Sequence, residues 1–341
     1  MLQRPGGHMR WPRLLSSRKT IFFGLDITFS SIKLLELYRA DDHYGVKSYG
    51  HCDLANDIMH GHFVRDIPAL AKAIQQLLLD VGLYERPDVI LEAVIAIPDA
   101  CTISKTISVS DRLSDQDLEE LVHLELEKFI PGSTADLCFD FKRLGSSSSH
   151  ALQELLIVAT RVQHVQDRLD ALHHAGLRAK VVDIESFAIQ RAFPFIMTSV
   201  SAQDVIMLLD VGHHVLKVYF FKHETLVFFR EEELSHEPYL PDTATSSSDL
   251  FYGESLVLRI KRACHFFYAA HAQSAELTQI LLSGDAVHDD LLQFISKSFK
   301  KPTYKVNPFT QMKRVDGVDI TALLSSAAMY LTACGLAKRG C

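Results

Sequence analysis

The feature that most constrains this chain is a unit of two apolar strands joined by a short polar turn. Residues 21–37 hold one copy: an apolar run that ends in Asp26, a turn of small hydroxyl residues, and a second apolar run. In such a turn, successive backbone N–H groups and hydroxyls can point into one concavity, which suits a phosphate chain. A plain β-hairpin whose Asp caps the turn is the competing interpretation.

A second copy of the unit lies far downstream, at residues 205–221. Its first strand ends in Asp210, and its turn contains Gly212 followed by His213 and His214. Each copy opens a segment whose hydrophobic pattern predicts a new α/β lobe. Two related lobes that face each other, each with an Asp and a phosphate-gripping turn, would hold a magnesium nucleotide in a central cleft. The repeat therefore carries more weight than either copy alone.

Further candidate residues for a nucleotide lie at strand ends and turns. Ser283 and Gly284 end a predicted strand, where a small residue lets the backbone approach a flat ligand such as adenine. Glu185 begins a predicted helix and either faces the cleft or caps that helix. Asp26 and Asp210 would hold Mg²⁺ through water if a nucleotide binds. The full candidate set is Asp26, Thr28, Ser30, Ser31, Lys33, Glu185, Asp210, Gly212, Ser283 and Gly284.

Composition excludes several other classes of protein. The formal charge of −7 gives no attraction for nucleic acid. The six cysteines are scattered without a close pair, which argues against a disulfide framework or a zinc site and fits a reducing cytoplasm. No apolar run approaches the roughly 20 residues needed to span a bilayer. The basic start of the chain predicts a flexible arm, which either contacts anionic lipid headgroups or has no role.

The order of predicted elements divides this chain of 341 residues into an α/β protein with two lobes. Between the two hairpin units, residues 100–178 have a β-α-β-β-α order that predicts a small α+β module inserted into the first lobe. The predicted divisions are a basic arm (1–19), the first lobe (20–99), the inserted module (100–178), a return to the first lobe (179–199), the second lobe (200–319) and a C-terminal helix that closes the first lobe (320–341).

Several segments, in the right order, resemble the actin-like ATPase superfamily and, within it, the PilM proteins of type IV pilus assembly. The first hairpin resembles the family's first phosphate motif, and Leu209-Asp210-Val211-Gly212 resembles the second. Leu282-Ser283-Gly284 resembles the adenosine motif, and residues 125–131 resemble a segment of the family's inserted subdomain. The resemblance covers residues 20 to 340.

The resemblance implies a bilobed actin-like fold, made of ribonuclease H-like repeats, with an inserted subdomain in the first lobe. It also implies a cytoplasmic protein peripheral to the inner membrane. PilM proteins bind the N-terminal cytoplasmic peptide of PilN in a groove between the first lobe and the insert, near PilO and the pilus motor ATPases. We expect one wall of that groove at Glu127, Lys128, Phe129, Ile130 and Pro131.

Two departures from the family pattern bear on the nucleotide. His213 and His214 replace a Thr that meets the phosphates, and Asp285 stands where a second Gly is usual. A carboxylate close to phosphates without a metal between them is unfavourable. We therefore expect weak or absent binding of ATP with magnesium, no catalytic residues and a scaffold function. The alternatives are an active ATPase or kinase of the same superfamily, and a relative of FtsA or of a secretion-system protein.

Overall fold

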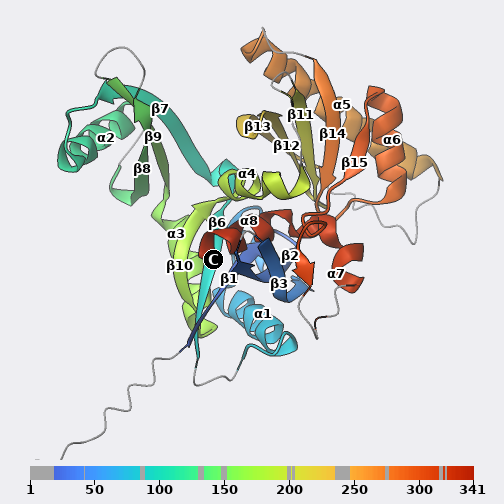
Figure 1. Cartoon of the computed structure of the whole chain (residues 1–341), viewed down its shortest axis with the longest axis horizontal. Coiled ribbons are helices and arrows are strands. Elements are labelled where there is room, and N and C mark those ends of the chain that lie inside the picture. The colour runs from blue at the N-terminus through green and yellow to red at the C-terminus, as the bar shows by residue number, and fades with distance from the viewer. Residues whose placement is uncertain are drawn as a thin grey trace, which may run out of the picture.

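The computed structural model describes residues 19–41, 43–84, 89–129, 134–146, 152–197, 201, 204–234, 246–272, 276–314, 318 and 321–341. They form two sheet-based lobes and a smaller module that projects from the first lobe (Figure 1). The predicted basic arm falls almost wholly on residues 1–18, which lie outside the described residues. None of the helices in the described ranges combines the length and the apolarity needed to cross a membrane.

The first lobe is built on a six-stranded sheet in the order β10-β6-β1-β2-β3-β16. Its strands are β1 (Lys19–Ile27), β2 (Ser31–Ala40), β3 (His43–Asp53), β6 (Val89–Ile97), β10 (Arg178–Ile184) and β16 (Lys313–Arg314). Strands β1 to β3 form an antiparallel meander, and β6 and β10 continue parallel to β1. Alternate residues of β1, such as Phe23 and Leu25, enter a core with α1 (Ile67–Asp80) and α3 (Val162–His174).

The second lobe repeats this topology. Its sheet has the order β13-β12-β11-β14-β15, with three antiparallel strands followed by two parallel ones. The strands are β11 (Val205–Val211), β12 (Val215–Lys222), β13 (Thr225–Glu233), β14 (Leu277–Ser283) and β15 (Thr303–Lys305), and the helices are α5 (Ser246–Ala270) and α6 (Asp289–Phe299). This repeat confirms the predicted two-lobed α/β architecture.

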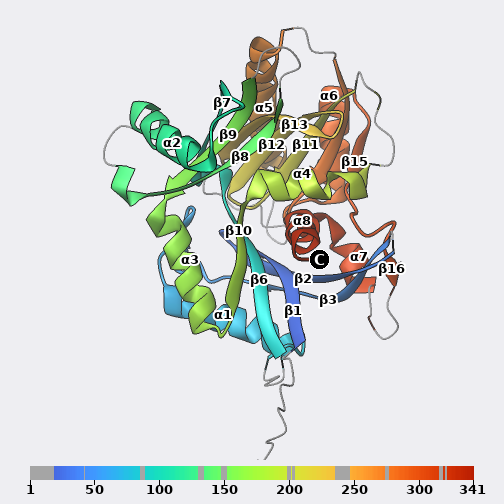
Figure 2. The same cartoon turned by 60° about the vertical axis from the view of Figure 1, so that its left-hand side comes forward.

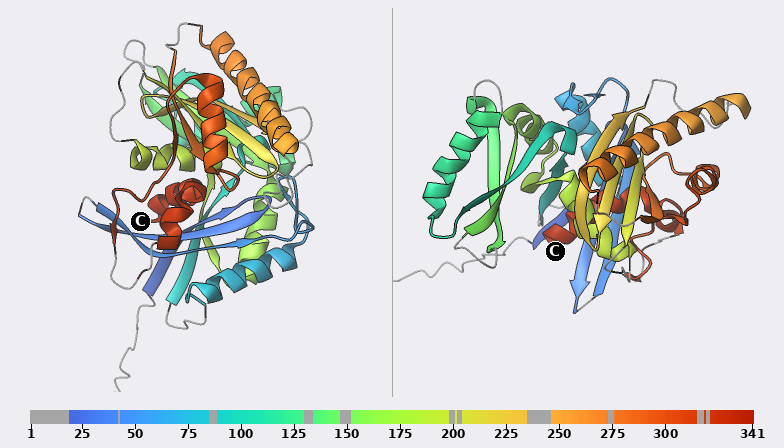
Figure 3. Two further views of the ribbon diagram at one scale, coloured as in Figure 1. Left: turned by 90° about the vertical axis from the view of Figure 1, so that its right-hand side faces the viewer. Right: turned by 90° about the horizontal axis from the view of Figure 1, so that it is seen from above.

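The inserted module has a three-stranded sheet in the order β7-β9-β8, covered on one face by α2 (Asp115–Phe129). The strands are β7 (Thr102–Ser110), β8 (Leu137–Ser146) and β9 (Leu152–Arg161). A capping box starts α2, since Ser114 and Asp117 exchange hydrogen bonds. The module stands beside the two lobes rather than within them (Figure 3). Short elements complete this half of the chain: β4 (Met59–His60), β5 (Phe63–Val64), η1 (Asp99–Cys101) and η2 (Thr134–Asp136).

The packing places two predicted boundaries differently. Helix α3, assigned to the insert by its sequence position, packs against α1, and its Ala171 and Leu172 lie in the first-lobe core. The insert therefore ends near Arg161, because the apolar face of α3 is buried in the lobe. The C-terminal segment, predicted as one helix, is broken into α7 (Thr321–Ser325), a 3₁₀ turn (Ala327–Tyr330) and α8 (Leu331–Gly340).

Two helices join the lobes. Helix α4 (Glu185–Ile196) and α8 lie between the two sheets (Figure 1). Phe193 of α4 stacks on Phe221 of the second lobe with ring centroids 4.2 Å apart, and both belong to a core that includes residues of both sheets. Burial of this shared apolar surface holds the lobes together.

Glycine permits the close approach of α8 to its neighbours. A Cβ on Gly335 would lie 1.8 Å from the carbonyl oxygen of Ala188 in α4, and one on Gly24 of β1 would lie 2.4 Å from the carbonyl oxygen of Ala333. Both obstacles are backbone atoms, which cannot rotate away. A glycine at position 335 is therefore a packing requirement of the fold.

Gly335→Ala is expected to lower the free energy of unfolding by about 3 kcal/mol or more, because α8 must move away from α4. Gly340→Ala, at the end of the same helix, is the matched control. Its Cβ would meet Phe22 at 3.3 Å and Val94 at 3.4 Å, so its cost should stay below about 1 kcal/mol. Chemical denaturation of both variants checks this, and equal stabilities would contradict the close-packing account.

Candidate functional site

The two hairpins place an Asp opposite a Lys in each lobe. Asp26 of β1 pairs in register with Lys33 of β2, and Asp210 of β11 pairs with Lys217 of β12. All four side chains line the space between the lobes. Both lysines are buried, at 2% and 8% exposure, so each of them needs a partner of opposite charge.

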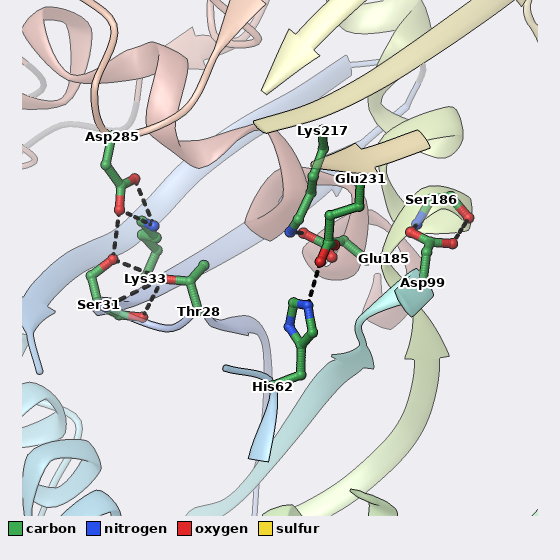
Figure 4. Close-up of polar contacts among 10 residues, drawn as sticks. All are labelled: Thr28, Ser31, Lys33, His62, Asp99, Glu185, Ser186, Lys217, Glu231 and Asp285. Carbon is green, nitrogen blue, oxygen red and sulfur yellow. Dashed lines mark hydrogen bonds and ion pairs between the residues drawn. The ribbon is translucent and has the colours of Figure 1, made fainter. Parts of the chain in front are cut away.

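Lys33 finds its partner in the other lobe. Its Nζ lies 2.7 Å from Oδ1 of Asp285 and 2.8 Å from Oδ2, and the Ser31 hydroxyl donates to Oδ2 at 2.8 Å (Figure 4). Burial opposes both charges, but the attraction of Asp285 and Asp26 raises the pKa of Lys33, and Lys33 lowers the pKa of Asp285. Both groups therefore stay charged, as an ion pair between the lobes in which Lys33 is buried and Asp285 is half-buried.

Lys217 makes the reciprocal contact. It extends from the second lobe to Oε1 of Glu185, the first residue of α4 in the first lobe (Figure 4). Burial opposes its charge, but Glu185 and then Asp210 raise the pKa of Lys217. The helix itself is capped by Asp99, whose carboxylate accepts from the N–H and the hydroxyl of Ser186. Of the two alternatives that the sequence left open for Glu185, the structure shows the cleft-facing one.

Two further contacts close the cleft. The turns themselves meet, since the Phe29 and His214 rings pack edge to face with centroids 4.5 Å apart. His62 of the first lobe lies 2.5 Å from Glu231 of β13. His62 is held in turn by the buried Arg168, which donates to its carbonyl oxygen at 3.0 Å.

The polar groups of the turns are bonded within the protein. The Thr28 hydroxyl donates to the Ser31 carbonyl oxygen at 3.0 Å, and the Ser31 N–H donates to the Thr28 hydroxyl oxygen at 3.2 Å. The Ser283 hydroxyl donates to the Ala328 carbonyl at 3.0 Å. Gly284 has φ of +110°, and a Cβ there would lie 2.4 Å from the Val211 carbonyl oxygen. The backbone of the expected adenosine motif thus packs against the second phosphate motif of its own lobe.

The space that remains in the cleft is a cavity of about 70 Å³. Every predicted nucleotide residue except Ser31 lines it: Asp26, Thr28, Ser30, Lys33, Glu185, Asp210, Gly212, Ser283 and Gly284. Sites for drug-sized ligands usually measure about 300–1,000 Å³. In this conformation the cavity is therefore smaller than such a site. Within the described residues, no group of three or more His, Cys, Asp or Glu side chains is arranged to hold a metal ion.

Of the two hairpin aspartates, Asp26 is buried and Asp210 is half-buried, and the lysine opposite each one is paired with another carboxylate. Burial raises the pKa of Asp26 to about 7, and the charges of Glu185 and Asp210 add to this, while Lys33 and Lys217 oppose it. Burial also raises the pKa of Asp210. In both cases the raised pKa shifts the carboxyl group toward its neutral form.

Sequence reasoning missed several members of this network: Lys217, His62, Arg168 and Glu231, together with the true role of Asp285. A signal for Lys217 was present, since each hairpin carries a Lys seven positions after its Asp. Asp285 was expected to repel a ligand, but it is the partner of Lys33. His62 and Arg168 carry no local pattern and become visible only in the fold.

A second, larger cavity lies between the insert and the first lobe, and we call it the insert groove. It measures about 840 Å³. Strands β8 and β9 form one side, β10 and α4 another, and the β12–β13 turn contributes Glu224 and Thr225. Figure 2 shows the junction of β8, β9 and β10 at which it lies. Its apolar lining is Ile97, Phe139, Phe141, Leu144, Leu156, Val158, Val165, Val182, Ile184 and Phe187.

Only two residues of the predicted groove wall, Glu127 and Lys128, can be compared with this lining. Glu127 and Lys128 lie on α2, on the far face of the insert sheet, and are not among the residues that line the insert groove. Phe129 ends α2, and Ile130 and Pro131 lie outside the described residues. The residues of β8 and α4 are therefore stronger candidates for partner contacts.

The repeated lobes and the cleft between them define an actin-like protein. The family model "Type IV pilus assembly protein PilM" matches residues 24–239 and 239–341, and the chain belongs to this family. A solved structure of a PilM-PilN type IV pilus biogenesis complex is similar with a TM-score of 0.74 and 21% identity, over 93% of this chain and 98% of that chain. The ethanolamine utilization protein EutJ from Carboxydothermus hydrogenoformans is similar with a TM-score of 0.49 and 11% identity, over 92% and 88% of the two chains.

Breaking the Lys33–Asp285 pair should destabilise the protein strongly. Lys33→Met leaves Asp285 buried without its cation and should cost about 3–5 kcal/mol of unfolding free energy, whereas the double variant Lys33→Met/Asp285→Leu should recover most of the loss. Arg143→Met, which breaks the exposed pair with Asp115, is the control and should cost at most about 1 kcal/mol. Chemical denaturation measures all three, and a double variant no more stable than Lys33→Met would refute the ion-pair account.

Asp26→Asn should stabilise the protein at alkaline pH. A carboxyl group whose pKa is raised by folding stabilises the fold at low pH, and this stabilisation is lost as pH rises from its unfolded value near 4 to about 7. Across that range the unfolding free energy of the variant should therefore rise relative to that of the wild type by on the order of a few kcal/mol. Above pH 8 the difference between the two should be constant. Burial also raises the pKa of Asp99 to about 7. Because Asp99 is present in both proteins, its contribution to the pH dependence is the same in each. Thermal melts from pH 4 to 9 without divalent cations test this, and a pH-independent gap would contradict it.

Proposed function

We propose that this chain is a non-catalytic scaffold of type IV pilus assembly, which binds the N-terminal cytoplasmic peptide of PilN in the insert groove. The observation that carries the proposal is the contrast between the two cavities, about 840 Å³ in the groove and about 70 Å³ in the cleft. The groove has the volume of a ligand site and the cleft does not.

The lining of the insert groove suits an apolar peptide. Most of its side chains are apolar, and the polar ones that face it include Asp183, Arg191 and Arg339 at one wall. The relative of known structure with the TM-score of 0.74 was solved as a complex with PilN. This likeness supports PilN as the partner of the present chain.

The closed cleft supports the non-catalytic part of the proposal. A nucleotide would have to displace Lys33 from Asp285 and Lys217 from Glu185, and it would have to separate Phe29 from His214. Each step exposes or unpairs buried groups, which opposes ATP binding. The cleft then acts as a structural joint between the lobes, and neither hydrolysis nor phosphoryl transfer takes place there.

The proposal has a consequence for location. A protein held by the cytoplasmic segment of PilN would lie at the cytoplasmic face of the inner membrane. PilO and the pilus motor ATPases would then be its neighbours in the assembly, reached through PilN rather than by direct membrane insertion.

Calorimetric titration with a synthetic PilN peptide and with magnesium ATP tests both halves of the proposal. We expect the peptide to bind and ATP to give no heat of binding up to millimolar concentration. Val158→Lys places a charge in the groove and should weaken peptide binding at least about tenfold, because the ammonium group must be desolvated.

Ser104→Lys is the matched control for the groove variant. Ser104 is exposed on β7, directly opposite Val158 in the ladder, and it does not line the groove. Equal binding by the two variants would remove the groove from the proposal. Tight ATP binding, with phosphate release that disappears in Asp210→Ala, would replace the scaffold by an active ATPase.

A further inference from the structure

The insert groove lies between the edges of two different sheets. β8 is an outer strand of the insert sheet, and β10 is an outer strand of the first-lobe sheet. Within the described part of the chain, neither strand pairs with a second neighbour. Consecutive residues of each strand, 138–142 of β8 and 182–184 of β10, line the groove. Since consecutive residues point to opposite faces of a sheet, the groove meets these strands at their edges.

Each edge carries an amide that bonds to the carboxylate of the preceding residue. The N–H of Phe141 in β8 donates to Oδ1 of Asp140 at 2.8 Å, and the N–H of Ile184 in β10 donates to Oδ1 of Asp183 at 2.9 Å. Such local bonds satisfy edge amides that have no partner strand. Both edges therefore offer hydrogen bonds that a peptide backbone can take over.

The two carboxylates differ in how firmly they are held. Asp183 is 3% exposed and forms ion pairs with Arg191 at 2.9 Å and with Arg339 at 2.5 Å. Asp140 is exposed to solvent. Displacing Asp140 releases a carboxylate into water, whereas displacing Asp183 breaks two ion pairs. The edge of β8 is thus the one that is open to a new strand.

From these contacts, and resting on the proposed function, we propose that the partner peptide binds as a fourth strand of the insert sheet, paired with the edge of β8. Its backbone takes over the amide of Phe141 and the other outward-facing groups of β8. Side chains on one face of the added strand then lie beside Cys138, Asp140 and Lys142 of β8, on the face of the sheet that α2 leaves uncovered.

Charge adds a requirement for the occupant. Two guanidinium groups share the single carboxylate of Asp183 at the opposite wall of the groove, and Glu224 also lines the groove. The fitting partner is therefore an extended peptide that places an oxygen acceptor toward Arg191 and Arg339.

The test is a scan of the synthetic PilN peptide in which one backbone amide at a time carries an N-methyl group. A strand paired on one side uses every second amide, so methylation at alternate positions should weaken binding at least about tenfold, and methylation between them should change it less than about threefold. Binding that tolerates every methyl group, or that shows no alternation, overturns strand addition while the proposed function stands. An unmodified peptide that fails to bind overturns both.

A second measurement acts on the protein instead of the peptide. Asp140→Ala removes the group that competes for the Phe141 amide and should tighten peptide binding about two- to tenfold. Asp136→Ala, an exposed position on the same module, makes the same change in charge and is the control. Weaker binding by Asp140→Ala, or equal binding by both variants, contradicts the assignment to the edge of β8.

Discussion

The structure as a whole depends on two buried lysines, one from each lobe, that form ion pairs across the cleft. Each lysine lies opposite an aspartate on its own hairpin, yet each one pairs with a carboxylate of the other lobe, Lys33 with Asp285 and Lys217 with Glu185. In a cleft built for a nucleotide, bound cations would neutralise such carboxylates. Here the ammonium groups of the protein supply positive charge to the carboxylates, and the cavity between the lobes measures about 70 Å³.

Closure of the cleft also shapes the insert groove, because both use the same helix. Glu185 at the start of α4 pairs with Lys217, while Phe187 and Arg191, within two turns, face the groove. The second lobe adds Glu224 and Thr225 to the groove wall. An opened cleft would move these residues away from β8 and β9. The ion pairs between the lobes therefore help to fix the walls of the groove.

The sequence predicted those features that depend on local pattern. Alternating and continuous apolar runs predicted the two hairpins and the repeat, and the strand ends placed Asp26, Asp210 and Gly284 at the cleft. The network between the lobes could not be predicted in the same way, because Lys33 and Asp285 are 252 positions apart and meet only when the lobes close. Likewise, the helical period of α3 predicts that it has an apolar face but not that this face packs on α1.

Buried ion pairs carry a large desolvation penalty, so apolar side chains of the same size would stabilise the contact between two lobes as well or better. Ion pairs add a requirement that an apolar interface lacks, since the lobes must be fully closed for the pairs to form. An apolar interface tolerates partial opening, because each contact is lost gradually with distance. A lysine withdrawn from its carboxylate inside a cavity of about 70 Å³ leaves two unpaired charges with little room for water. Intermediate openings are therefore the least stable states, and the reciprocal pairs, together with His62 and Glu231, favour one closed arrangement of the lobes around the insert groove.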